Sequence, residues 1–149
     1  MRERPELDVS PMAVVGRILN LGRALEARAN NSLKGTGLNY TDLDVLATLR
    51  RTGSPHELAP TALRRSVLIT SGAMTACLNR LEKAGLISRR PEDNDRRSLM
   101  AALTPKGRAL IDKAIGIRFA EAHEVVSGLS RAEQAQLAEL LKNLGASLK

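Results

Sequence analysis

The stretch ITSGAMTACLNRLEKAGLISRRPEDNDRRSLMAAL, residues 69–103, carries the strongest structural pattern in the sequence. Its first half begins with Thr70 and Ser71, residue types that cap helices, and reaches Gly85, a residue type that ends them. Its second half contains two short apolar runs, LISRR and SLMAAL, separated by the charged PEDNDRRS at residues 91–98. The pattern predicts a helix followed by a β-hairpin with a long charged tip.

The predicted helix, residues 71–84, has two chemically different sides when its residues are placed 100° apart. The side expected to face the core is apolar and consists of Met74, Cys77, Leu78 and Leu81. The opposite side has no bulky apolar residue and no carboxylate, and it consists of Gly72, Thr75, Ala76, Asn79, Arg80 and Lys83. Such a side fits the major groove of DNA, which is about 12 Å wide. The alternative is a polar side that faces only solvent.

The polar positions on this helix have chemistry suited to DNA. Asn79 can pair with adenine and Arg80 with guanine, and each good pair contributes roughly 1–3 kcal/mol of discrimination. The hydroxyl groups of Thr70 and Ser71, with the free amides at the helix start, can meet phosphate. The further candidates for phosphate contact are basic side chains near this helix: Arg64, Arg65, Arg89, Arg90 and Lys106.

The charged tip fits the same interpretation. The minor groove is narrow and negative, so the guanidinium of Arg96 or Arg97 is a suitable probe for it. Asp95 is a poor contact for DNA, and we expect it to hold one of these arginines through a forked ion pair. The acidic Glu92 and Asp93 count against a DNA-facing tip, and we place them on its solvent side.

The flanking sequence predicts further helices. Ser10-Pro11 and Thr41 are expected to start two helices before the central stretch, and Pro60 a helix of about two turns after a short strand at 56–58. Thr104-Pro105 and Ser130 are expected to start two more. The predicted fold is mainly α with a small β-hairpin, a winged helix-turn-helix in one domain. Its DNA-binding lobe spans 41–103, its dimerisation helices span 11–35 and 105–147, and the domain covers residues 1–149.

Composition agrees with this class. The chain of 149 residues has one Tyr, one Phe and no Trp, so its core must consist of aliphatic residues and Met. The net charge is +7, and residues 64–108 hold ten Lys or Arg against four Asp or Glu. This excess favours a polyanion such as DNA or an anionic surface, although a solvated basic face is the alternative. No apolar stretch resembles a signal peptide or a membrane span, so we expect a cytoplasmic protein.

The span from Leu46 to Leu110 resembles the MarR family of bacterial transcription regulators. The resemblance rests on LDVLATLRR and on ITSGAMTACLNRLEKAGLISRRPEDNDRRSLMAALTPKGRALI, whose recognition helix, charged wing with Asp95 and Arg97, and LTPKG match the family pattern. It implies a homodimer, an operator with two-fold symmetry and release of DNA by a small ligand. The apolar stripes of the first and last helices also favour pairing across a two-fold axis.

The segment RPELDVSPMAVVGRI together with LDVLATLRR is similar to the urate-responsive branch of this family, in which an N-terminal Trp, an Asp and arginines form the ligand site. Asp44 matches that Asp, and the Trp is missing here. The candidate ligand residues are Arg17, Asp44 and Arg51, for a small aromatic or purine-like effector. The alternative role for Asp44 is capping or pairing within its own helix.

Other functional classes have weaker support. Cys77 lies on the apolar side of its helix, so we expect it to pack in the core rather than to act as a redox sensor. Two distant histidines predict no metal site, and no phosphate loop or nucleophile–base arrangement predicts an enzyme or a cofactor. The remaining alternative to a DNA-binding repressor is a winged-helix module that binds a protein.

Overall fold

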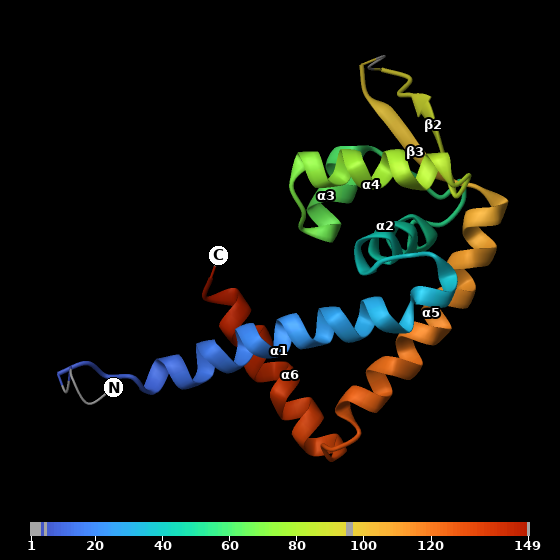
Figure 1. Ribbon diagram of the computed structural model, residues 1–149. Coiled ribbons are helices and arrows are strands. Elements are labelled where there is room, and N and C mark those ends of the chain that lie inside the picture. Colours follow the sequence, from blue (N-terminus) through green and yellow to red (C-terminus); the bar gives the residue numbers. More distant parts are fainter. Residues whose placement is uncertain (1–3, 5, 95–96, 149) are drawn as a thin grey trace.

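The computed structural model describes residues 4, 6–94 and 97–148, which form a mainly helical chain with a small antiparallel sheet (Figure 1). This confirms the predicted fold class. The elements in chain order are α1 (Ser10–Ser32), η1 (Lys34–Thr36), α2 (Tyr40–Arg51), β1 (Glu57–Leu58), α3 (Pro60–Val67), α4 (Ser71–Lys83), β2 (Ile87–Pro91), β3 (Leu99–Leu103), α5 (Pro105–Val126) and α6 (Arg131–Ala146).

The sheet forms the predicted wing. Its strand order is β1-β3-β2 with antiparallel pairs, so that Ile87 lies opposite Leu103 and Pro91 opposite Leu99. The short β1 pairs with the other edge of β3, through Glu57 and Leu58. The hairpin of β2 and β3 projects past one end of α4, away from the terminal helices (Figure 1).

One hydrophobic core lies under α4 and among the elements around it. The largest fully buried side chains include Leu33, Leu46, Leu49, Leu63, Leu78, Leu81, Ile87 and Ile111. Gly107 explains how the first turn of α5 fits against this lobe, because a Cβ there would come within 2.0 Å of the Leu86 carbonyl oxygen. Only glycine allows α5 to start so close to β2.

The predicted helix starts of α1, α3, α4, α5 and α6 are confirmed, and that of α2 is corrected. The side chains of Thr70, Thr104 and Ser130 cap α4, α5 and α6. In contrast, α2 is capped by Asn39 rather than Thr41, because Asn39 and Asp42 form a reciprocal capping box. α1 begins at Ser10 with Pro11 in its first turn, as predicted, but its N-cap residue is Val9, and the Ser10 amide donates to the Asp8 carboxylate at 2.9 Å. The helix ends at Ser32, before a 3-10 turn and Gly37 with φ of 74°.

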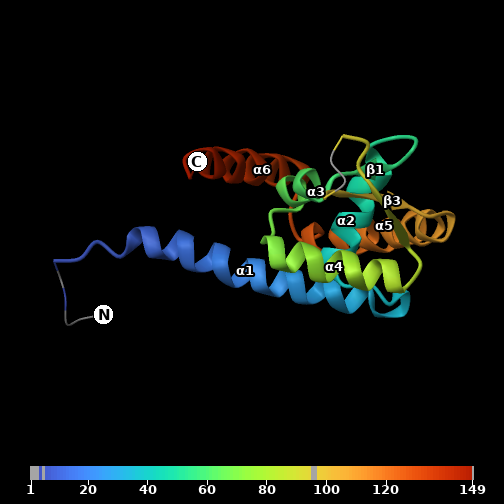
Figure 2. The same cartoon turned by 90° about the horizontal axis from the view of Figure 1, so that it is seen from above.

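The terminal helices bury little. No residue of α6 is buried, and Ala29 is the single buried residue of α1. In Figures 1 and 2 α1 extends well beyond the winged lobe, and Figure 1 shows α5 and α6 forming a V below it. Their exposed large apolar side chains include Val14, Val15, Leu19, Leu21, Phe119, Leu137, Leu140, Leu141 and Leu144.

Candidate nucleic-acid interface

The two sides of α4 are arranged as the sequence predicts. Its apolar side is buried, with Met74, Cys77, Leu78 and Leu81 each at most 2% exposed. Its opposite side is exposed along the whole helix and lies next to the wing. The exposed positions include Gly72, Thr75, Ala76, Asn79 and Lys83. The Thr70 side chain accepts a hydrogen bond from the Ala73 amide, while the Thr75 hydroxyl donates to the Ser71 carbonyl.

Arg80 has a partner in the lobe that the sequence did not reveal. Its guanidinium turns back to α2, where Nη2 lies 2.5 Å and Nε 3.2 Å from Oδ1 of Asp42. The Asp42 side chain is only 3% exposed, so this ion pair offsets the cost of burying its charge. This pair engages Nε and Nη2 of Arg80, whose side chain remains 49% exposed. In this structure Arg80 joins α4 to α2, and its predicted contact with guanine stays a prediction.

Cys77 belongs to the same buried group. Its Sγ–H donates to Oδ1 of Asp42 at 3.3 Å, and burial raises the pKa of the Cys77 thiol to about 12. A thiol with such a pKa stays protonated at neutral pH and is a poor nucleophile. The predicted role in core packing is confirmed.

Arg89 is held next to α4 by partners on that helix. From β2 its Nε donates to Glu82 at 2.9 Å, and its Nη2 donates both to Glu82 and to the Asn79 side-chain oxygen, the latter at 2.7 Å. The hydrogen bond from Arg89 holds the pKa of the Glu82 carboxyl below its ordinary value, so the pair persists at neutral pH. The wing and the recognition helix are thus connected through charged side chains.

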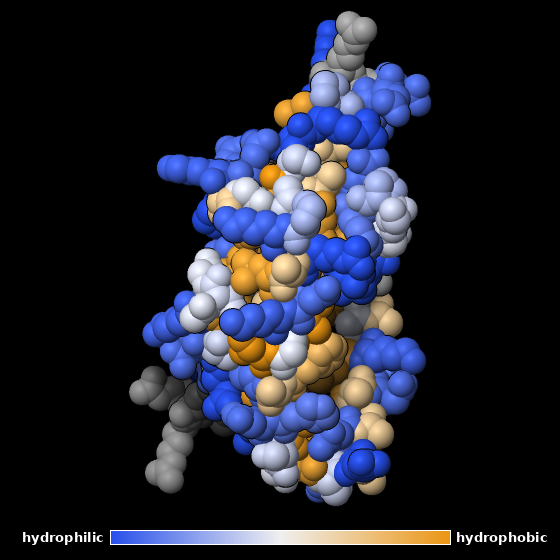
Figure 3. Space-filling view, turned by 90° about the vertical axis from the view of Figure 1, so that its right-hand side faces the viewer, coloured by the Kyte–Doolittle hydropathy of each residue, from blue (hydrophilic) through white to orange (hydrophobic). Residues whose placement is uncertain are grey.

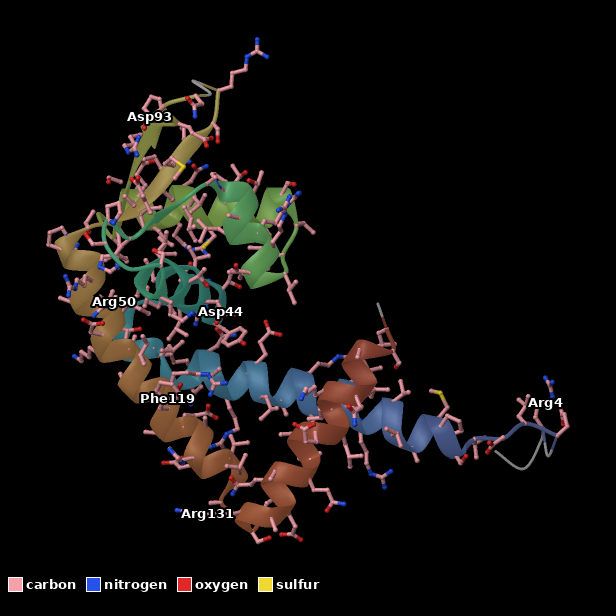
Figure 4. The ribbon with its side chains drawn as sticks, turned by 180° about the vertical axis from the view of Figure 1, so that it is seen from behind. Arg4, Asp44, Arg50, Asp93, Phe119 and Arg131 are labelled. Atoms are coloured by element: carbon pink, nitrogen blue, oxygen red, sulfur yellow. The ribbon has the colours of Figure 1, made fainter. Side chains whose placement is uncertain are left out.

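Arg90 is also engaged within the wing. Its Nη2 lies 2.6 Å from Glu57 on β1, and its Nη1 lies 3.3 Å from Asp93 near the tip. Asp93 is 87% exposed, in agreement with its predicted solvent-facing position (Figure 4). These contacts tie the two edges of the small sheet together, so Arg90 has a structural role in addition to any phosphate contact.

The other basic candidates have different surroundings. Arg64 donates to the Ser71 hydroxyl, which joins α3 to the start of α4, and Arg65 is exposed. Lys106 donates to the Ala84 carbonyl at 2.8 Å. It therefore caps the end of α4, which the sequence did not reveal because the two positions are 22 residues apart.

The wing tip is partly described. Asp95 and Arg96 lie outside the described residues, whereas Arg97 is exposed. Arg97 lines a hollow of about 410 Å³ together with Thr61 of α3, Thr75 of α4 and Arg89 of β2. Figure 3 shows that hydrophilic side chains cover most of the wing and of the face below it, with small apolar patches between them. This combination of donors and positive charge suits a polyanion.

The predicted ligand residues are only partly brought together. Asp44 lies on the side of α2 that faces α1 (Figure 4), and Arg51 is close enough to influence its titration. Burial raises the pKa of the Asp44 carboxyl, while Arg51 and Arg118 oppose that rise. Arg17 is different, since it lies exposed on α1 and donates to the Ala13 carbonyl at 2.8 Å.

Two residues near Asp44 were missed from the sequence. The Tyr40 hydroxyl shares a hydrogen bond with Asp44, and burial raises the pKa of Tyr40. Arg118 of α5 lies with its guanidinium carbon 5.9 Å from the centre of the Tyr40 ring and also pairs with Glu121. The four-residue spacing of Tyr40 and Asp44 was a usable signal. Nothing in the sequence connects Arg118 to them, because it comes from a distant helix.

Two kinds of feature do not occur among the described residues. No helix there is long and apolar enough to cross a membrane. No group of three or more His, Cys, Asp or Glu residues in that part of the chain is arranged to hold a metal ion.

Comparison with known proteins places this geometry in context. Residues 38–99 match the model of the MarR family. The HTH-type transcriptional regulator PecS of Dickeya dadantii is 34% identical over 139 residues, which are 93% of this chain and 84% of that protein. A probable transcriptional regulator from Pseudomonas aeruginosa superposes with a TM-score of 0.78 and 29% identity, over 87% of this chain and 96% of that chain.

A third relative supports the fold alone. The MarR family regulator Sco3205 from Streptomyces coelicolor, whose structure was solved in complex with DNA, has a TM-score of 0.85 and 21% identity. The match covers 96% of this chain and 94% of that chain. The similarity thus includes the terminal helices as well as the winged lobe.

Proposed function

This chain belongs to the MarR family, and from that premise we propose that it is a sequence-specific DNA-binding transcriptional regulator, a repressor that binds a palindromic operator as a homodimer. The observation that carries the proposal is the exposed, donor-bearing side of α4 lying next to an arginine-bearing wing. A helix in the major groove with a wing over the neighbouring minor groove uses both features. No catalytic activity and no cofactor is part of this proposal, and the relatives compared above are regulators.

The homodimer is supported by the terminal helices. Leu140 is 59% exposed and Phe119 65% exposed, among a series of apolar side chains on α1, α5 and α6. Large apolar side chains that remain exposed on neighbouring helices favour an interaction site. A two-fold axis through these helices would place two copies of α4 on half-sites about 34–36 Å apart.

We also propose that a small effector binds between α2 and the terminal helices, near Asp44 and Arg51. The support is a half-buried carboxylate beside Tyr40, Arg51 and Arg118, a set that can accept and donate hydrogen bonds to a planar polar ligand. A small aromatic acid or a purine-like molecule, as in the urate-responsive branch, fits this chemistry. Arg17 would join the site only if α1 or a partner subunit brought it closer. The proposed place of action is the cytoplasm, where bacterial DNA lies.

Selection of bound sites from random duplex DNA tests the main proposal. A dimeric repressor should enrich a palindrome, and its affinity should fall steeply with salt because it displaces ions from phosphates. A winged-helix module that binds a protein instead would enrich no sequence and would bind its partner with little salt dependence. The proposed effector site is tested by adding aromatic acids and purines to the complex with the selected DNA. Fluorescence anisotropy then measures whether the DNA is released.

A further inference from the structure

We propose that Arg89 sets the base preference of the recognition helix, because it fixes which end of the Asn79 side-chain amide faces the DNA. The inference rests on the proposed DNA binding and refines it to one position of each half-site. It predicts that Asn79 meets a base edge that offers hydrogen-bond acceptors, such as guanine or the O4 edge of thymine, and not adenine.

The geometry begins with the contact between β2 and α4. Nη2 of Arg89 lies 2.7 Å from Oδ1 of Asn79, and Nε of Arg89 lies 2.9 Å from Glu82, one turn farther along the same helix. The Arg89 side chain is only 19% exposed, so its position is set by packing as well as by these bonds. Two acceptors on one helix therefore hold the guanidinium in place.

The chemistry of arginine then determines the orientation of the amide. A guanidinium has donors and no acceptor, so the group of Asn79 that faces Arg89 must be its oxygen. The amide NH₂ is then left for another partner, and Asn79 is an exposed residue of α4. The orientation is thus imposed by the protein before any DNA arrives.

This orientation changes the base that Asn79 can recognise. An asparagine pairs with adenine by accepting from N6 and donating to N7, which requires both ends of its amide along one edge. Here Arg89 occupies one of the two lone pairs of the oxygen, so the adenine amino group would have to bind the other lone pair beside a guanidinium whose N–H donors repel it. Guanine presents two acceptors, O6 and N7, and thymine presents O4, so these edges suit the donors that remain. The pairing of Asn79 with adenine predicted from the sequence is replaced by this preference.

The rest of α4 makes the inference testable at a single position. Arg80, the neighbouring candidate reader, is bound to Asp42 on the other side of the helix. Arg90 supplies a matched control, since it is the adjacent arginine of β2 but pairs with Glu57 and Asp93. Replacing either arginine by methionine removes one charge and keeps a similar length, and only Arg89→Met releases the oxygen of Asn79.

The experiment is site selection from random duplex DNA with the full-length protein and three variants, each checked for thermal unfolding. Asn79→Ala identifies the position, because base preference should be lost there and kept elsewhere. At that position the wild-type protein should select guanine or thymine. In Arg89→Met the frequency of adenine relative to guanine or thymine at that position should rise by roughly 10-fold. Arg90→Met should leave the preference at this position as it is in the wild-type protein.

Three results would overturn the inference. They are adenine selected by the wild-type protein at the Asn79 position, an unchanged preference in a folded Arg89→Met variant, and an equal shift in Arg90→Met. If Arg89→Met does not fold, the inference is tested by comparing the wild-type protein with Asn79→Ala. The base that the wild-type protein prefers at the position where Asn79→Ala loses its preference must then be guanine or thymine, and adenine would refute the inference. A wild-type protein that enriches no palindrome refutes the proposed function itself, whereas a palindrome without the Arg89 effect refutes only the role of Arg89.

Discussion

The winged lobe and the terminal helices differ in how much they bury their apolar side chains. In the lobe, Leu46, Leu49 and Leu63 are completely buried, and α4 alone buries four side chains. In α6 the apolar positions Leu137, Leu140 and Leu141 remain exposed although they recur with helical spacing. The lobe therefore completes its core within one chain, whereas the terminal helices require another surface. The fold of one protomer thus forms the winged lobe, and the proposed homodimer would cover the exposed side chains of the terminal helices.

The largest expected effect comes from placing a charge on the unpaired surface. Leu140→Asp should separate the protomers, because the aspartate would be desolvated at the interface. Operator affinity should then fall by roughly 10²-fold or more, since two half-sites are no longer bound together. Analytical ultracentrifugation and anisotropy measure the two effects, with Lys142→Ala on the same helix as the control. A monomeric variant that kept wild-type affinity would contradict the account of the terminal helices.

A change in the core of the lobe should act on folding instead. Leu46→Ala removes a fully buried side chain, so the free energy of unfolding should fall by about 2–5 kcal/mol, as measured by denaturant titration. Leu68→Ala makes the same chemical change at a side chain that is 87% exposed, and it should alter that free energy by no more than about 0.5 kcal/mol. Equal losses in the two variants would show that the core is placed wrongly.

Arg80→Ala tests the contact that joins the recognition helix to the lobe. It leaves the carboxylate of Asp42 without its cation, which should cost about 1–3 kcal/mol of folding stability. DNA affinity should fall to a similar extent on specific and nonspecific sequences, because α4 loses its anchor rather than a base contact. A loss of affinity restricted to one base pair of each half-site would instead show that Arg80 contacts a base.

The smallest effect concerns Asp44. Because burial raises its pKa in the folded protein, stability should decline as pH increases from the ordinary value of 3.8 through the higher folded pKa. Asp44→Asn should remove this decline and raise the melting temperature at neutral pH. The control is Asp112→Asn, because Asp112 is an exposed carboxylate that pairs with Arg50. A lower melting temperature for Asp44→Asn at pH 7 would mean that the ionised carboxylate is stabilising.

The sequence predicted the parts of this structure that depend on local pattern. The buried side of α4, the wing and three of the helix caps follow from periodicity and from residue type at single positions. The pairing of Arg80 with Asp42, of Arg89 with Asn79 and of Tyr40 with Arg118 does not. Each of these contacts joins different elements, and a long flexible arginine can turn to either side of its helix or strand. The predicted roles of individual arginines were therefore less secure than the predicted positions of the helices.

The most direct test of the central claim is a hydroxyl-radical footprint of the wild-type protein and of Arg97→Ala on the selected operator. The account predicts protection of the minor groove beside each recognition-helix half-site, because the wing reaches the groove next to α4. In Arg97→Ala that flanking protection should disappear while protection by α4 persists. Identical footprints of the wild-type protein and Arg97→Ala would contradict the claim that the recognition helix and the wing bind DNA together. A wild-type footprint confined to the half-sites would contradict it as well.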